Sequence, residues 1–305
     1  MIRGGTMAED HPAPAVQPGT LYVVATPLGN LGDITLRALE VLRAVPLVAC
    51  EDTRRTRPLL TRFGISNRLV SYHDFNERSR TRQLLDHLRA GADAALVSDA
   101  GTPMLSDPGA ELVGACRRAG VPVVPVPGPS APACLLSVSD LPGGPVLIAG
   151  FPPARRAERG RFLDGLAAAP HTTVFFEAPH RIVALLEDLL ARWGDRACLC
   201  GREMTKLHEE YRRDTLAGLL AELRRRGAPK GEFTLAVAGA AVPRGADDEG
   251  GDAPVDAAAL RREFRRLSRE GLSRAEALRR LGRAHGLPRN RLYRLLLNDD
   301  QSEIS

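Results

Sequence analysis

The sequence lacks any run of apolar residues long enough to cross a membrane. No stretch of the 305 residues approaches the roughly 20 consecutive apolar residues that span a bilayer. Residues 1–18 are polar and rich in Pro and Ala, without the apolar centre of a signal peptide. We therefore expect a disordered leader over residues 1–18, a cytoplasmic location and no membrane partner.

Cysteine and aromatic residues are scarce. Of the five cysteines, only Cys198 and Cys200 are close in sequence, and they lack the two-residue spacer and the second pair that zinc sites usually show. On a strand both thiols would point in the same direction, so we predict buried, reduced thiols and no metal site. Aromatic residues make up 4% of the chain, which disfavours stacking on many unpaired bases.

Several nucleotide and hydrolase motifs are also missing. Gly29 and Gly32 do not complete the Gly-x-Gly-x-x-Gly pattern of a dinucleotide site, no Gly-x-x-x-x-Gly-Lys-Ser/Thr loop occurs, and no serine lies in a nucleophile elbow. Lysine is rare, because only Lys206 and Lys230 among the 42 basic residues are lysine. Arginine cannot replace a lysine whose role depends on a shiftable pKa, so both are candidate functional residues.

The most informative segment that is present covers residues 98–109, Ser-Asp-Ala-Gly-Thr-Pro-Met-Leu-Ser-Asp-Pro-Gly. It follows a short apolar run and precedes a helical pattern, and α/β proteins bind ligands where a strand passes through such a loop into a helix. Small residues let the backbone approach a ligand, while Ser, Thr and Asp supply polar groups. We therefore predict a ligand-binding loop.

From Thr20 onward, short apolar runs alternate with amphipathic helical patterns, which predicts parallel strands joined by right-handed crossovers. The first set of strands is expected at residues 21–25, 47–50, 68–71, 94–98 and 121–126. After a Pro-Gly-Gly-Pro break a second set follows, and its pattern leaves open whether its sheet is parallel or mixed. The second set of strands is expected at residues 146–149, 172–176, 197–200 and 233–238.

The net charge of +5 belongs to the end of the chain. Residues 1–254 hold 30 basic and 30 acidic side chains, whereas residues 255–305 hold 12 Arg and 7 acidic residues. A capping box at Ser273–Glu276 and a stop at Gly286 predict short helices in a helix-turn-helix-like module. Such a module suits a polyanionic partner, although a solvated helical surface remains an alternative.

These patterns predict five regions. They are a leader at 1–18, an N-terminal α/β domain at 19–141, a second α/β domain at 142–241, a linker at 242–254 and a basic helical domain at 255–305. In a parallel sheet the carboxyl ends of the strands lie along one edge, so loops that are distant in sequence should meet there. The loops expected to converge cover residues 26–33, 51–54, 72–77, 98–109 and 127–131.

Several segments together resemble the tetrapyrrole methylase superfamily, the class III S-adenosylmethionine-dependent methyltransferases. The resemblance rests on residues 20–37, 98–109, 127–131, 176–181 and 230–233, and covers roughly residues 19–240. Within the superfamily it points to enzymes that methylate the ribose 2′-hydroxyl of a cytidine in the decoding region of 16S ribosomal RNA. It implies two α/β domains flanking a cofactor cleft, S-adenosyl-L-methionine as cofactor, and 16S rRNA or the small ribosomal subunit as partner. Relatives also suggest a homodimer.

The resemblance implies cofactor contacts from both domains. The cofactor-binding residues expected from it are Leu28, Asp99, Gly101, Thr102, Pro103, Leu105, Ser106, Ser130, Ala131, Phe176, Pro179, Lys230 and Gly231. A ribose hydroxyl is a poor nucleophile, so a base or a charge that stabilises the alkoxide would help. The candidates for that role are Asp33, His73, Glu203 and Lys206, and a structural ion pair between Glu203 and Lys206 is an equal alternative.

Two other functions remain open at this point. A carbon methyltransferase of porphyrinoid rings would share the fold and the cofactor, but the basic tail favours RNA over that substrate. A nonenzymatic RNA-binding or regulatory protein would use the helical tail alone. Binding of S-adenosylmethionine, and loss of activity when the loop around Gly101 is changed, would separate the enzyme from the binding protein.

Overall fold

The computed structural model describes residues 19–142, 144–227, 229–240, 256–287, 292, 295 and 296. The predicted leader and linker lie outside these described residues. The chain divides into two compact units, Met1–Ala240 and Ala241–Ser305. Within the described residues, no helix combines the length and apolar character that crossing a bilayer requires.

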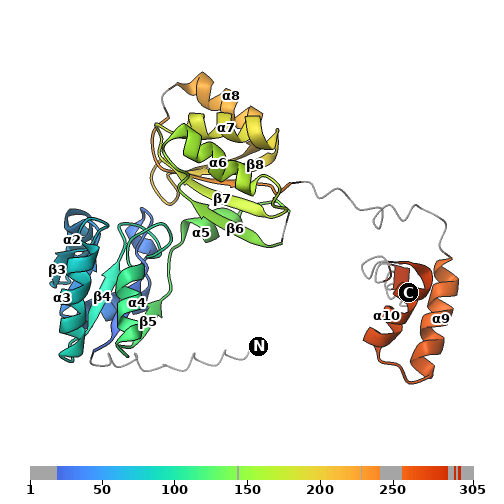
Figure 1. Cartoon of the computed structure of the whole chain (residues 1–305), viewed down its shortest axis with the longest axis horizontal. Coiled ribbons are helices and arrows are strands. Elements are labelled where there is room, and N and C mark those ends of the chain that lie inside the picture. Colours follow the sequence, from blue (N-terminus) through green and yellow to red (C-terminus); the bar gives the residue numbers. More distant parts are fainter. Residues whose placement is uncertain are drawn as a thin grey trace, which may run out of the picture. The chain divides into compact units, whose positions relative to one another are not determined.

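The first unit begins with a parallel sheet in the order β3-β2-β4-β1-β5 (Figure 1). Its strands are β1 (Leu21–Val24), β2 (Leu47–Cys50), β3 (Arg68–Ser71), β4 (Ala94–Val97) and β5 (Val123–Val126). The five predicted strands are thereby confirmed. Strand β5 starts two residues later than expected because the Val121 amide closes the preceding helix on the Cys116 carbonyl.

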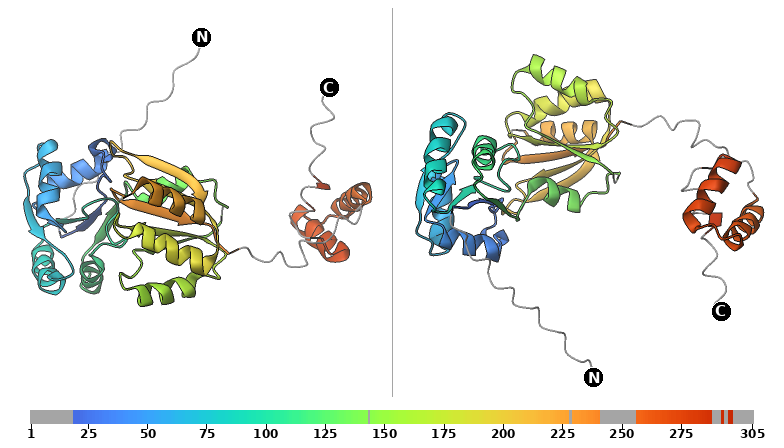
Figure 2. Two further views of the ribbon diagram at one scale, coloured as in Figure 1. Left: turned by 90° about the horizontal axis from the view of Figure 1, so that it is seen from above. Right: turned by 60° about the horizontal axis from the view of Figure 1, so that its bottom comes forward.

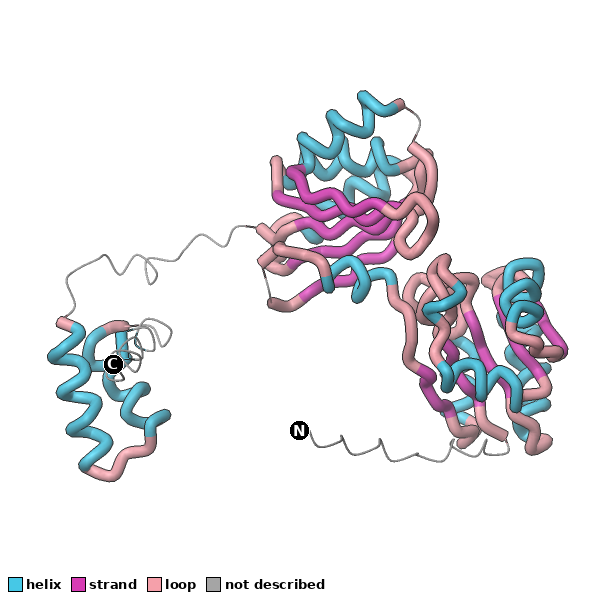
Figure 3. The backbone as a smooth tube through the Cα atoms, turned by 180° about the vertical axis from the view of Figure 1, so that it is seen from behind, coloured by secondary structure: helices cyan, strands magenta, loops and turns pink. Residues whose placement is uncertain are grey.

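Helices cover both faces of this sheet (Figure 3). They are α1 (Leu36–Ala44), α2 (Thr53–Arg62), α3 (Glu77–Arg89) and α4 (Ala110–Arg118). One face packs against α1 and α2 through residues such as Leu42 and Leu60, and the other packs against α3 and α4 through Leu84 and Leu112. Burial on both faces explains why the central strands β2 and β4 are apolar at every position.

The second sheet of this unit is mixed, in the order β6-β7-β10-β8-β9. Its strands are β6 (Val146–Gly150), β7 (Thr172–Glu177), β8 (Ala197–Arg202), β9 (Glu210–Thr215) and β10 (Phe233–Val237). Strands β6 and β7 are parallel and the remaining pairs are antiparallel. This settles the question that the sequence left open, and the prediction of two α/β domains is confirmed.

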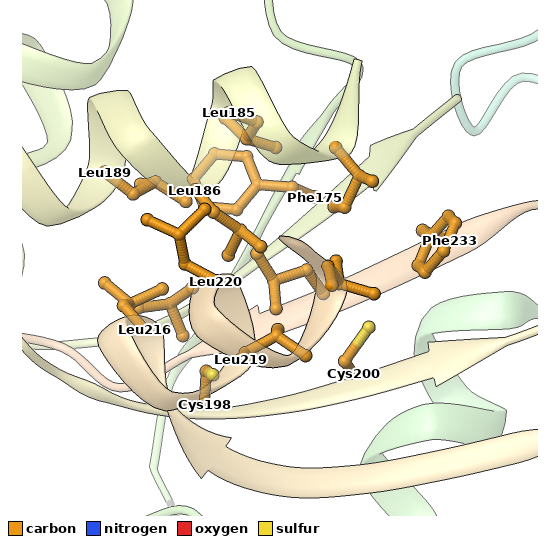
Figure 4. Packing of buried hydrophobic residues seen from close by; sticks show 14 of the residues in the cluster. Phe175, Leu185, Leu186, Leu189, Cys198, Cys200, Leu216, Leu219, Leu220 and Phe233 are labelled. Atoms are coloured by element: carbon orange, nitrogen blue, oxygen red, sulfur yellow. The ribbon is translucent and has the colours of Figure 1, made fainter. Parts of the chain in front are cut away.

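The second sheet also has helices on both faces. They are α5 (Ala131–Ser137), α6 (Arg156–Leu166), α7 (Ile182–Trp193) and α8 (Leu216–Arg226). The apolar core beneath α7 and α8 includes Phe175, Leu185, Leu220 and both predicted thiols, Cys198 and Cys200 (Figure 4). Helix α5 packs on the opposite face against a smaller cluster. Of the five cysteines, all of which are free, only Cys134 is incompletely buried.

The second unit is a small helical module with its own core. Helices α9 (Ala257–Arg269) and α10 (Arg274–His285) lie against each other (Figure 2). Their shared core includes Leu260, Leu267, Leu278 and Leu281. The predicted capping box is present at Ser273, and α10 ends at Gly286, whose φ of 61° is left-handed. After α10, the described residues Leu292, Leu295 and Leu296 are helical as well.

Candidate active site

A cavity of about 890 Å³ lies at the carboxyl ends of the first sheet's strands. All five predicted loops contribute to its wall, so their predicted convergence is confirmed. Residues at the ends of β7 and β10 complete the wall from the second sheet. A cavity of this size falls within the range of small-molecule sites, about 300–1,000 Å³.

Most residues predicted to bind a cofactor line this cavity. They are Leu28, Asp99, Gly101, Thr102, Leu105, Ser106, Ser130, Ala131, Phe176 and Pro179. Three others do not line it. Pro103 is buried within its own loop. Lys230 and Gly231 lie instead beside β8, where the Lys230 carbonyl accepts a hydrogen bond from Arg202 and Gly231 packs against Glu203.

The loop at residues 98–109 is hydrogen-bonded to the loops after β1 and β5. The backbone of Gly101 exchanges two hydrogen bonds with Thr26 after β1, at 2.8 and 3.0 Å. The Thr102 hydroxyl donates to the Pro129 carbonyl after β5 at 3.0 Å. Gly101 has a φ of +83°, and a Cβ there would come within 3.1 Å of Leu28. The position therefore favours glycine for its backbone angle, and a side chain there would have to displace Leu28.

The same loop holds two non-glycine residues in left-handed backbone conformations. Met104 and Ser106 both have a φ of 71°. Such conformations cost of order 1–3 kcal/mol each and persist where the surrounding contacts enforce them. They cluster at ligand sites, which supports a functional role for this loop.

Two carboxylates that were not predicted as site residues, Glu51 and Asp107, line the cavity together with Asp99. Burial, reinforced by the charge of Glu51, raises the pKa of Asp107 to about 6, although a hydrogen bond from Ser98 opposes the shift. Burial also raises the pKa of Glu51, with added repulsion from Asp99, and the pKa of Asp99, with added repulsion from Asp52. The sequence signal was available, because Asp107 lies in the loop already singled out and Glu51 directly follows β2.

His73 lines the cavity, as expected of a candidate catalytic residue. Its Nε2 atom lies 3.0 Å from the side-chain amide nitrogen of Asn76. The Asn76 side-chain oxygen accepts a hydrogen bond from the His73 backbone amide. The Asn76 side-chain nitrogen therefore faces the imidazole and donates to Nε2. The neutral ring then carries its proton on Nδ1, which is buried and without a hydrogen-bond partner. In this arrangement the Nε2 lone pair is occupied by the hydrogen bond from Asn76.

Glu203 and Lys206 do not line the cavity and instead form a structural ion cluster with Glu232. The Lys206 ammonium lies 2.9 Å from Glu203 and 3.0 Å from Glu232. Burial lowers the pKa of Lys206, but its hydrogen bonds to the two carboxylates outweigh this and raise it overall. A lysine held in its charged form does not act as a base. The remaining candidate, Asp33, is exposed at the end of a short 3₁₀ helix outside the cavity wall.

The ion cluster joins the two sheets of the first unit. A Cβ at Gly29 would collide with the aliphatic chain of Lys206, and the Asn30 amide donates to the Thr205 hydroxyl at 3.1 Å. Gly29 and Asn30 adjoin Leu28, which lines the cavity. Lys206 therefore acts as a positioning residue for this loop.

We expect Lys206→Met to reduce stability by about 1 kcal/mol, because the hydrogen bonds to two carboxylates are lost while the aliphatic packing stays. Activity should fall less than about tenfold, without a change in its pH profile, because Lys206 lies outside the cavity wall and two carboxylates keep it charged. Urea denaturation and steady-state rates from pH 5 to 9 measure both effects. Lys230→Met is the matched control. A loss of a thousandfold in kcat would contradict the positioning role.

Comparisons with known proteins agree with this geometry. The profile of the family described as tetrapyrrole (corrin/porphyrin) methylases matches residues 20–220. A protein of Micromonospora olivasterospora named ribosomal RNA small subunit methyltransferase I is 49% identical over 276 residues, covering 90% of this chain and 85% of that protein. A protein of the same name from Synechocystis sp. is 45% identical over 281 residues, covering 92% and 98%.

Among solved structures, a uroporphyrin-III C-methyltransferase from Thermus thermophilus, complexed with S-adenosyl homocysteine, has the same fold. It is 22% identical, with a TM-score of 0.52, and the match covers 71% of this chain and 96% of that one. At this level of identity the likeness concerns the fold alone.

Proposed function

Because the chain belongs to the tetrapyrrole methylase family, we propose that it is an S-adenosylmethionine-dependent methyltransferase acting on the ribose 2′-hydroxyl of a cytidine in the decoding region of 16S ribosomal RNA. The observation that carries this proposal is the cavity formed by five convergent loops, together with relatives named for ribosomal RNA that match nearly the whole chain. The two alternatives, a carbon methyltransferase of porphyrinoid rings and a nonenzymatic RNA-binding protein, predict different results in the experiments on substrate and cofactor.

The cavity suits the proposed cofactor chemically. S-adenosylmethionine carries a positively charged sulfonium, and the carboxylates of Glu51, Asp99 and Asp107 lie in the cavity wall. A nearby cation would stabilise the ionised carboxylates and so offset the effects of burial and repulsion, which raise their pKa values. Elsewhere in the wall, Gly101 has no side chain and so contributes only backbone, and Leu28 provides an apolar surface.

Asp107 is the side chain that we propose to accept the proton of the ribose hydroxyl. When bound, S-adenosylmethionine supplies a methyl carbon to which the ribose oxygen bonds while the carbon–sulfur bond breaks, its electron pair passing to sulfur. A pKa near 6 leaves Asp107 ionised at neutral pH yet basic enough to take a proton. The cavity wall orients the two reactants, which contributes a large part of such rate enhancements.

The decisive experiment is mass-spectrometric mapping of 16S ribosomal RNA from cells that lack this protein, followed by transfer of labelled methyl to their small subunits by the purified protein. We expect one cytidine to lose its ribose methyl and to regain it in vitro. Methyl transfer to a base atom, or to a porphyrinoid ring and not to RNA, would contradict the proposal. Failure to bind S-adenosylmethionine would favour the nonenzymatic alternative.

The tail unit offers a surface that suits the phosphates of RNA. Four arginines of α9 recur at helical spacing on the side opposite to Leu260, Phe264 and Leu267, and all four are exposed. They are Arg262, Arg265, Arg266 and Arg269. The ion pairs of Arg262 with Asp256 and of Arg266 with Glu270 are solvent-exposed, so they offer little resistance to exchange for phosphate.

Changing Arg262, Arg265 and Arg269 to Gln together should weaken RNA binding and leave cofactor affinity unchanged. Each phosphate contact contributes roughly 0.7–0.9 to the slope of log affinity against log salt, so the slope should fall by about 2–3. Filter binding of small subunits at several salt concentrations measures it. The control removes three exposed arginines from the first unit, Arg82, Arg89 and Arg117. An equal loss in both triple variants would argue against a specific role of α9.

We further propose a homodimer and a cytoplasmic location, the compartment of the proposed substrate. Edge strand β6 exposes Val146 and Ile148, and Val138 and Phe151 nearby in sequence are also exposed. An exposed apolar strand at a sheet edge is a typical self-association surface. Light scattering should give about twice the 32.9 kDa chain mass, and Ile148→Asp should give a monomer. A monomeric parent protein would contradict the proposal.

A further inference from the structure

The strand order divides the cavity into two flanks. Because the order is β3-β2-β4-β1-β5, the loops after β1 and β5 lie on one side of the loop after β4, and those after β2 and β3 lie on the other. Most residues expected to bind the cofactor belong to the loops after β4, β1 and β5. The flank formed by the loops after β2 and β3 also lines the cavity, and the family resemblance assigns none of its residues to cofactor binding.

An aromatic ring stands at this second flank. Phe75 is 98% exposed and lines the cavity, which makes it the most exposed of the large apolar side chains in the described residues. Its one ring neighbour among the described aromatic contacts is His73, at 6.0 Å in an edge-on arrangement. At 98% exposure the Phe75 ring is accessible to a flat partner.

The turn that carries Phe75 is held rigidly. The Asn76 side chain accepts from the His73 amide at 2.9 Å and donates to the Ser71 carbonyl at 3.2 Å. Behind it, Glu77 accepts from the Tyr72 hydroxyl at 3.0 Å and from the Gly109 amide at 3.2 Å. The turn is thus tied both to the end of β3 and to the end of the 98–109 loop. These hydrogen bonds therefore hold the exposed Phe75 ring in a fixed position at the cavity.

Cationic side chains accompany the ring. Arg54 and Arg55 follow β2, line the same flank and have side chains that are 90% and 64% exposed. Arg54 pairs with Asp52, and Arg55 lies 3.4 Å from Asp99. An aromatic face that stacks a base, next to guanidinium groups that suit a phosphate, is the combination by which proteins bind unpaired nucleotides.

We propose that the flank formed by the loops after β2 and β3 binds the acceptor nucleotide, with its base stacked on Phe75. This inference rests on the proposed function and adds the place and the contact of the substrate. Asp107, in the loop shared by both flanks, then faces the ribose of the nucleotide and the cofactor at once. A single stacking ring fits a chain with few aromatic residues, since only one base must be unstacked from the RNA.

The test compares Phe75→Ala with Phe75→Trp. Removing one stacking contact should raise KM for small ribosomal subunits about 10- to 100-fold, whereas Trp should keep KM within about threefold of the parent. The affinity for S-adenosylmethionine, measured by calorimetry, should stay unchanged in both. Leu36→Ala is the matched control, because Leu36 is 79% exposed on α1 and does not line the cavity.

A binding readout complements the kinetics. The chain has one tryptophan, Trp193, which is buried, so Phe75→Trp adds a single exposed fluorophore. Stacking should quench the emission of the added tryptophan in the Phe75→Trp variant when small subunits are added. The same subunits should leave the emission of Trp193 in the parent protein unchanged. An unchanged KM in Phe75→Ala with an active parent would overturn the nucleotide subsite alone. A parent protein that transfers no methyl to small subunits would instead overturn the proposed function.

Discussion

Replacing Asp107 with Asn is expected to lower kcat by about 10²- to 10⁴-fold, the usual contribution of a positioned general base. Asparagine keeps the size of the side chain and its hydrogen bond with Ser98 but cannot take up a proton. In the parent protein kcat/KM should fall about tenfold per pH unit below about pH 6, because a carboxyl with a raised pKa is ionised only above that pH. Steady-state rates from pH 4.5 to 9 measure both effects.

The stability of the Asp107→Asn variant distinguishes lost chemistry from lost folding. Burial disfavours the charged form of Asp107 in the folded protein, whereas the unfolded chain hydrates it fully. Above about pH 6 the parent therefore carries a destabilising charge that Asn removes, so the variant should be at least as stable as the parent at pH 8. An Asp107→Asn protein with parental kcat would remove Asp107 from the mechanism and direct attention to Glu51.

Replacing Gly101 with Val should weaken S-adenosylmethionine binding about 10- to 100-fold, because a β-branched residue at positive φ strains the loop by about 1–3 kcal/mol. The new side chain would also press on Leu28, since even a Cβ at this position comes within 3.1 Å of it. Isothermal calorimetry measures the affinity directly, independently of any RNA substrate.

Gly91→Val provides the matched control for Gly101→Val. Gly91 has a φ of +86°, close to the +83° of Gly101, but it has open space around its Cβ position and lies outside the cavity wall. Both variants should lose similar stability from backbone strain, and only Gly101→Val should lose cofactor affinity. Equal affinity loss in the two proteins would mean that strain spreads through the domain and that Gly101 has no local role.

The fold was predictable wherever the apolar pattern was strong. The five strands of the first sheet are short apolar runs that helices bury on both sides, so composition alone marks them. Strand β9, Glu-Tyr-Arg-Arg-Asp-Thr, was missed because it lies at a sheet edge and only half buries its side chains. Its conformation depends on pairing with β8, a non-local contact that a local pattern does not reveal.

The site was predictable in its loops and less so in its chemistry. Parallel strands brought the loops together as expected, and most expected cofactor residues line the cavity. Lys206 attracted attention through its rarity, but its orientation is decided by Glu203 and by Glu232, which is 26 residues further along the chain. Asp107 escaped attention because its raised pKa results from burial, and burial is a property of the assembled fold.

The separation of the two cavity flanks onto different strands has a consequence for how this scaffold can diversify. Mutations at Arg54 or Phe75 alter this flank without touching the hydrogen bonds that join Gly101, Thr26 and Pro129, or the contacts of Glu77 and Arg55 with residues 98–109. We therefore expect that the acceptor can change while the methyl donor stays the same. A library randomised at Arg54 and Phe75, with Asp52, Arg55, Glu77 and residues 98–109 kept, is a starting point for redirecting methylation to another substrate.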